Sequence, residues 1–184
     1  MRLSSATTLR RGLVALVAAA ALAAPLGARA SLLDGLSIRG GFWRSDRATV
    51  REAVGEVMWG GGLDYKIAHF PALLNGDQWS TSLSADFHYS EKKSSGVFRM
   101  IPVSVNQVYT FDQESSTSPY AGFFLSAVTI NGTDQPTITR IGGGLLAGLN
   151  VAGSIYVEGR YQWVDSHGLD TSLPGLFGYV GYRF

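Results

Sequence analysis

The segment from Asp86 to Ser90 brings together the residue types of a hydrolytic site. Asp86, His88 and Ser90 alternate with two aromatic residues, so an extended strand would place all three side chains on one face. An imidazole beside a hydroxyl can activate it as a nucleophile, and a carboxylate can orient that imidazole. The same alternation also fits a histidine that lies among polar neighbours and performs no reaction. We favour this second interpretation and keep the first open.

Other candidate chemistry is weaker. His69 and His167 are expected in turns or loops, and no set of His, Asp and Glu has the spacing of metal ligands. The glycine triplets at 60–62 and 142–144 are not followed by the Lys-Ser or Lys-Thr of a phosphate loop, and we expect no helix after them. Such glycines permit curvature or close packing in strands. We therefore expect no metal and no cofactor.

Residues 1–30 have the organisation of an export signal. Basic residues precede an apolar run from Leu13 to Leu26, and Ala28-Arg29-Ala30 fits a cleavage site after Ala30. The run is shorter than the roughly 20 residues of a spanning helix, which disfavours the alternative of an uncleaved anchor. We expect one mature domain, residues 31–184, in which no apolar run is long enough for a transmembrane helix.

The composition favours an exported protein built from strands. The chain has no cysteine, which excludes disulfides and thiolate metal sites. Its formal net charge of +1 gives no indication of a nucleic-acid partner. Glycine and aromatic residues are abundant, with 23 Gly, 4 Trp, 8 Tyr and 9 Phe, and this composition suits strands better than helices.

Apolar and polar residues alternate in segments of about ten residues, the pattern of transmembrane β-strands. Between Trp79 and Ser90, one face is apolar or aromatic and the other carries Ser, Asp and His. Turn residues such as Asn75-Gly76-Asp77 and Asn131-Gly132 separate the segments. The predicted strands are Leu36–Arg44, Glu56–Ile67, Trp79–Ser90, Phe98–Phe111, Tyr120–Ile130, Thr137–Leu149, Ser154–Trp163 and Leu176–Phe184. The expected fold class is all-β, a single antiparallel transmembrane β-barrel of eight strands.

Alternation alone does not separate a barrel in lipid from a soluble sandwich, because the two differ only in which face is buried. The aromatic residues favour the barrel, since many lie near strand ends, where a girdle at the membrane surface would place them. These residues are Trp79, Tyr89, Tyr109, Tyr120, Tyr161, Trp163 and Phe184.

The chain ends in a strand that reads Val180-Gly181-Tyr182-Arg183-Phe184. This ending resembles that of the small outer-membrane barrels of the OmpX, Ail and OmpA type. The resemblance implies a place in the bacterial outer membrane, and it implies that Val180, Tyr182 and Phe184 belong to the signal read by the barrel-assembly machinery. It extends over the mature chain as a pattern and over the last strand as a motif.

The alternation places ten charged or titratable residues on the inner faces of the expected strands. An eight-stranded barrel is filled by its own side chains, and unpaired charges inside it would be costly. We therefore expect an ionic and hydrogen-bonded plug, and regard a proton or ion path as the less favoured alternative. The residues are Arg39, Glu56, Asp64, Lys66, Asp86, His88, Arg140, Glu158, Arg160 and Arg183.

The string His88-Tyr89-Ser90 is similar to one carried by the lipid A 3-O-deacylases, which are built on a small outer-membrane barrel. In that family the string lies in a late strand, and its residues work at the lipid-facing surface. Here it lies in the third expected strand and points inward. An acyl hydrolase that uses His88 and Ser90, with Asp86, is the second functional hypothesis.

The first hypothesis is a non-enzymatic barrel, expected to be monomeric, that supports the envelope or binds partners through short outward loops. Outer-membrane lipids and lipopolysaccharide are expected partners, and the loop cations could contact lipopolysaccharide phosphates. We favour a solvated charged rim as the explanation of these cations. The third hypothesis is a small transporter or a barrel for apolar ligands, which a charged interior disfavours. The cations considered are Arg44, Arg47, Arg51, Lys92 and Lys93.

Overall fold

The computed structural model describes residues 33–72, 76–92, 96–113, 115–133, 135–151, 153–165 and 173–184. The chain divides into the units Met1–Asp34 and Gly35–Phe184, and the second unit is the barrel. The predicted export signal, residues 1–30, and His167 lie outside the described residues. None of the described helices is long and apolar enough to cross a membrane.

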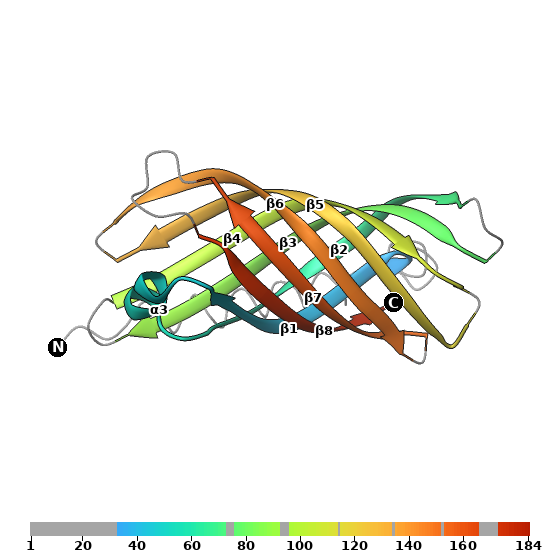
Figure 1. Cartoon of the computed structure of the whole chain (residues 1–184), viewed down its shortest axis with the longest axis horizontal. Helices are drawn as coiled ribbons and strands as arrows, with labels where there is room; N and C mark the ends of the chain where they lie inside the picture. The colour runs from blue at the N-terminus through green and yellow to red at the C-terminus, as the bar shows by residue number, and fades with distance from the viewer. Residues whose placement is uncertain are drawn as a thin grey trace. The chain divides into compact units, whose positions relative to one another are not determined.

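Eight antiparallel strands form one closed barrel, which confirms the predicted fold class (Figure 1). The strands are β1 (Leu36–Ser45), β2 (Met58–Pro71), β3 (Gln78–Lys92), β4 (Gly96–Thr110), β5 (Thr117–Gly132), β6 (Gln135–Val151), β7 (Ile155–Val164) and β8 (Gly175–Arg183). Each strand pairs with its neighbours in sequence, and β1 pairs with β8 from Ser37↔Arg183 to Ser45↔Gly175. Closure leaves no unpaired strand edge, as a sheet that crosses lipid requires.

The wall of the barrel is apolar outside and mostly polar inside. Along β4, Ile101, Val103 and Val105 face outward and are 38%, 50% and 47% exposed. Ser104 and Asn106, which alternate with them, are buried inside. This arrangement inverts that of a soluble sandwich and is the signature of a transmembrane barrel.

Most of the aromatic residues expected in girdles do lie on the outer surface. Trp79 and Tyr109 pack edge to face with their ring centroids 5.0 Å apart, and Tyr161 and Trp163 do so at 4.9 Å. Tyr120 is the exception, because its side chain points into the barrel and only 4% of the residue is exposed. Its hydroxyl donates to Glu158 at 3.1 Å, so the girdle prediction is wrong for this residue.

A short helix, α3 (Ala48–Val54), connects β1 to β2, where the sequence predicted only a loop. It buries Val50 and Val54 against the inner wall at one end of the barrel, which we call the α3 end. We call the opposite end, where β8 finishes, the Phe184 end (Figure 1). Gly55 ends the helix with φ of 102°, a conformation that favours glycine.

Apolar side chains fill the barrel behind α3. This apolar plug consists of Trp43, Val50, Val54, Met58, Met100, Val128, Ile130, Val164, Leu173, Phe177 and Tyr179. Hydrogen bonds fix α3 over it: Arg51 donates to the carbonyl oxygens of Ser45 at 2.8 Å and Asp46 at 2.7 Å, and the Ser90 hydroxyl donates to that of Val54. The plug closes the α3 end from the inside.

We expect Gly60→Ala to destabilise the barrel by about 1–3 kcal/mol, because the added methyl has no room. A Cβ at Gly60 would lie 2.1 Å from the Phe87 carbonyl oxygen and 2.8 Å from the His88 Cα. Gly159→Ala is the matched control, since its Cβ would meet nothing closer than 4.0 Å, and its effect should stay within about 0.5 kcal/mol. Urea unfolding in lipid vesicles measures both; equal stabilities for the two variants would contradict the packing described here.

Candidate functional site in the barrel interior

Arg39 is the centre of the polar interior. Its guanidinium, on β1, binds Asp86 of β3 through two parallel hydrogen bonds, Nε to Oδ1 at 2.7 Å and Nη2 to Oδ2 at 2.6 Å. The Arg39 and Asp86 side chains are 1% and 3% exposed. The guanidinium also lies 4.5 Å from the centre of the Tyr179 ring, within the range of a cation–π contact. The two parallel hydrogen bonds between Arg39 and Asp86 make this a bidentate pair, the strong form of an arginine–carboxylate contact.

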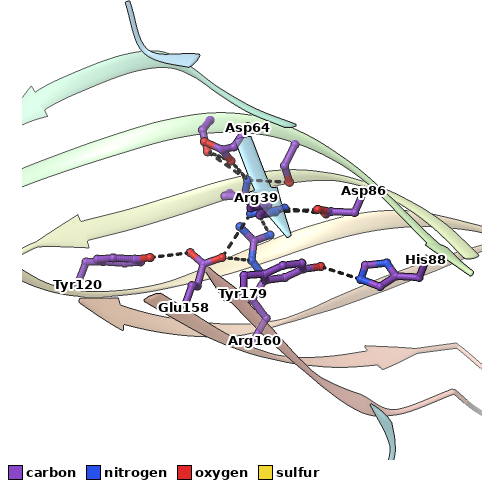
Figure 2. A network of polar contacts seen from close by, with 11 residues as sticks. Arg39, Asp64, Asp86, His88, Tyr120, Glu158, Arg160 and Tyr179 are labelled. Atoms are coloured by element: carbon purple, nitrogen blue, oxygen red, sulfur yellow. Dashed lines mark hydrogen bonds and ion pairs between the residues drawn. The ribbon is translucent and has the colours of Figure 1, made fainter. Parts of the chain in front are cut away.

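Glu158 of β7 connects this pair to a second arginine (Figure 2). One carboxylate oxygen, Oε1, accepts from Arg39 Nη1 at 3.3 Å and from Arg160 Nε at 2.6 Å. The other, Oε2, accepts from the Tyr120 hydroxyl at 3.1 Å. Two buried guanidinium groups are thus matched by two buried carboxylates, and the cluster is electrically neutral.

Asn106 extends the network toward the Phe184 end. Its side-chain carbonyl accepts from Arg160 Nη1 at 3.0 Å. Its amide nitrogen lies 3.1 Å from Asp64 Oδ2 and from the hydroxyls of Ser82 and Ser84. Ser82 also donates to Asp64 at 2.9 Å. The Asn106 amide therefore provides hydrogen bonds to an acidic group and to hydroxyl groups that no arginine of the network contacts.

A small polar cavity lies on the Phe184 side of the network. Its volume is about 40 Å³, and Asp64, Lys66 and Arg183 are among the residues that line it. Arg183 also donates to the side chain of Asn150 at 3.1 Å. The cavity has room for about three water molecules and is far smaller than the roughly 300 Å³ of the smallest usual ligand pockets.

Asp86, His88 and Ser90 share the inner face of β3, but each has a different partner. Both carboxylate oxygens of Asp86 bind Arg39, and Ser90 donates to the Val54 carbonyl. His88 is 0% exposed; its Nε2 lies 3.4 Å from the Tyr179 hydroxyl, and its ring packs against Phe177. Among the described residues, no hydrogen bond joins these three side chains into a catalytic relay.

Two of the predicted interior residues, Glu56 and Arg140, lie outside both the network and the cavity beside it. Glu56 precedes β2, and its side chain is 75% exposed and 3.4 Å from Arg51, so its assignment to the interior is wrong. The strand begins only at Met58, so the alternation does not reach Glu56. Arg140 lies opposite buried Val128 at the α3 end and donates to the Thr139 carbonyl at 3.2 Å.

Several residues of the site were missed by the sequence analysis, or were placed elsewhere. Asn106 and Tyr179 were not considered, and Tyr120 was expected on the outside. The alternation of β8 contained a signal for Tyr179, because Val180 and Tyr182 face outward and their neighbour must face inward. His69, expected in a turn, lies exposed in β2. Within the described part of the chain, no three His, Cys, Asp or Glu side chains could hold a metal ion together.

A comparison with solved structures supports the architecture. The crystal structure of the outer membrane enzyme PagL matches with a TM-score of 0.60 over 80% of this chain and 98% of that chain, at 17% sequence identity. This chain has the fold of the small eight-stranded outer-membrane β-barrels. At such identity the likeness concerns the fold alone.

Two further small barrels match at lower scores. Neisserial surface protein A has a TM-score of 0.48 and 17% identity, covering 81% of this chain and 96% of that one. The Ail protein of Yersinia pestis has a TM-score of 0.43 and 16% identity, covering 82% and 99%. No family model and no curated protein sequence matches the barrel.

We expect Arg39→Met or Asp86→Leu alone to cost about 3–5 kcal/mol of stability, because each leaves an uncompensated buried charge. The double variant should lose clearly less than the sum of the two. Breaking the exposed pair of Arg44 and Glu56, which are 3.7 Å apart, is the control and should cost less than about 1 kcal/mol. Urea unfolding of all variants in vesicles gives the coupling energy; additive losses at Arg39 and Asp86 would contradict the pairing.

Proposed function

We propose that this chain is a structural barrel of the bacterial outer membrane, which it reaches after export and cleavage near Ala30, and that it catalyses no reaction. The observation that supports this proposal is that the buried charges of the interior are paired with one another. The buried charges of Arg39, Asp86, Glu158 and Arg160 bind one another. Because these charges neutralise one another, none of the four is left as an uncompensated charge for a substrate.

The hydrolase hypothesis finds little support in the surroundings of His88. A lipid acyl chain would approach from the outer wall, whereas His88 faces inward beneath Gly60 and beside Phe177. The Ser90 hydroxyl is engaged by the last residue of α3. A nucleophile and its base must lie within hydrogen-bond reach of each other and of the substrate, and this arrangement provides neither contact.

The transporter hypothesis is disfavoured by the contents of the barrel. The apolar plug fills the α3 end, the ionic network crosses the middle, and the cavity at the Phe184 end is small. The interior of an eight-stranded barrel is just wide enough to be filled by its own side chains. A solute could pass only if both were displaced.

The last strand has the features of an assembly signal. Val180, Tyr182 and Phe184 all face outward and are 59%, 45% and 49% exposed, and the Tyr182 and Phe184 rings pack edge to face 5.2 Å apart. We also propose that the barrel-assembly machinery recognises this exposed stripe. It would bind β8 before β8 pairs with β1 and closes the barrel.

Deletion of the gene tests the structural role against the enzymatic one. Loss of the barrel should raise the uptake of a hydrophobic fluorescent dye into cells, because the envelope loses support. Both the wild-type chain and His88→Gln should restore uptake to the original level, with folding checked by the different mobilities of unheated and boiled samples on a gel. The mass spectrum of lipid A should be the same in all strains.

Two outcomes would contradict the proposal. A lipid A acyl chain that disappears with the wild-type chain and stays with His88→Gln would establish the hydrolase. Dye uptake that is unchanged by the deletion would remove the envelope role.

A further inference from the structure

Arg99 is a charged residue on an apolar wall. Its neighbour Met100 is 0% exposed inside the barrel, so Arg99 faces outward on β4, where it is exposed. The described residues offer its guanidinium neither a hydrogen bond nor an ion pair. A cation that faces a membrane without a protein partner needs an anion from its surroundings.

The position of Arg99 along β4 places it at the edge of the lipid-facing band. Between Arg99 and Tyr109 the outward residues are apolar except Gln107, which donates to the Thr81 hydroxyl at 2.7 Å. Ten residues of strand span about 33 Å, or about 25 Å across the bilayer at a tilt of about 40°. That is the thickness of the apolar band, so Arg99 lies at the level of the headgroups on the α3 side.

Aromatic neighbours support this level. In the strand register Arg99 is opposite Tyr89, and Tyr89 is opposite Trp59, which is 68% exposed. Trp59 packs edge to face with Phe42 at 6.1 Å, and the Tyr89 hydroxyl donates to Glu91 at 2.7 Å. Such rings gather at the boundary between acyl chains and headgroups. Trp59, Tyr89 and Arg99 form a continuous row over three strands, which we call the Arg99 row.

Two other arginines near α3, Arg44 and Arg51, differ from Arg99. The Arg51 guanidinium is held by two backbone carbonyls and lies 3.4 Å from Glu56. Arg44 lies 3.7 Å from the same carboxylate. Asn131, on the far side of Arg99, donates its amide to Thr137 at 2.6 Å. Among the described residues, nothing reduces the hydrogen-bonding capacity of the Arg99 guanidinium, which therefore has its full capacity for a ligand.

We propose that the Arg99 row binds a phosphate group of lipopolysaccharide in the outer leaflet. The inference rests on the proposed location in the outer membrane. We place the α3 end outward because the two longest connections between strands, residues 46–57 and 165–174, lie at that end, and outer-membrane barrels have short periplasmic turns and longer outward loops. The planar guanidinium donates two parallel hydrogen bonds to the phosphate, and the faces of Trp59 and Tyr89 pack against the adjoining sugar and acyl chains. The α3 rim then carries a bound glycolipid that anchors the barrel in its leaflet.

Native mass spectrometry of the purified, folded barrel tests this site. The barrel is reconstituted in nanodiscs that contain bisphosphorylated lipid A, and the lipid retained on release is counted. The wild-type barrel should retain lipid A, and Arg99→Gln should reduce that retention about tenfold, the effect of losing one charge-assisted contact. Arg44→Gln, at the same end but beside Glu56, is the matched control and should retain as much as the wild type.

Three outcomes would overturn the inference. One is equal retention by Arg99→Gln and the wild type, when gel mobility shows that both are folded. Another is equal retention of enzymatically dephosphorylated lipid A, which would assign binding to the acyl chains. The third is equal retention of phosphatidylglycerol, which would make the row a site for any lipid phosphate. Because the measurement uses the purified barrel, its failure is distinguishable from a failure of the deletion experiment.

Discussion

The need to neutralise one buried guanidinium organises the interior of this barrel. Arg39 is almost completely withdrawn from solvent, and a lone charge in that position would cost several kcal/mol. Asp86 and Glu158 supply two carboxylates from strands 47 and 119 residues away in sequence. Arg160 then balances Glu158, the Tyr120 hydroxyl donates to Glu158, and the Asn106 side-chain carbonyl accepts from Arg160. The strands must close in a single register for all these groups to meet.

The rest of the molecule follows from filling a narrow space completely. From the middle of the barrel toward the α3 end, the interior changes from charged to apolar. At that end α3 inserts Val50 and Val54, where the strands alone would leave the barrel open. His88 lies at the boundary between the two regions, with the Tyr179 hydroxyl near one ring nitrogen and Phe177 against its ring. His88, a residue type that can perform catalysis at a surface, contributes here to packing. Arg99 is on the outer wall, at the edge of the apolar band, and its charge has no partner among the described residues.

The fold could be predicted from two patterns in the sequence: alternate residues distinguish the two faces of each strand, and aromatic residues near the strand ends favour a barrel in lipid over a soluble sandwich. The strand from Trp79 to Ser90 could be recognised from that alternation alone, and β3 contains it entirely. The partners of each charge could not be recognised, since the pairing of Arg39 with Asp86 depends on the shear of the closed sheet. Tyr120 was misplaced because a tyrosine near a strand end fits a girdle and an inward hydrogen bond equally well. α3 was missed because it is seven residues long and has no side-chain N-cap.

We infer that the ionic network and the apolar plug together seal the barrel against ions. Planar lipid bilayer recordings on the purified, folded protein test it most directly, because an open lumen conducts ions and a filled one does not. We expect no steady conductance above that of the bare bilayer, in about 1 M salt as in dilute salt, because salt screens buried ion pairs only weakly. A stable conductance step with each inserted barrel would contradict it.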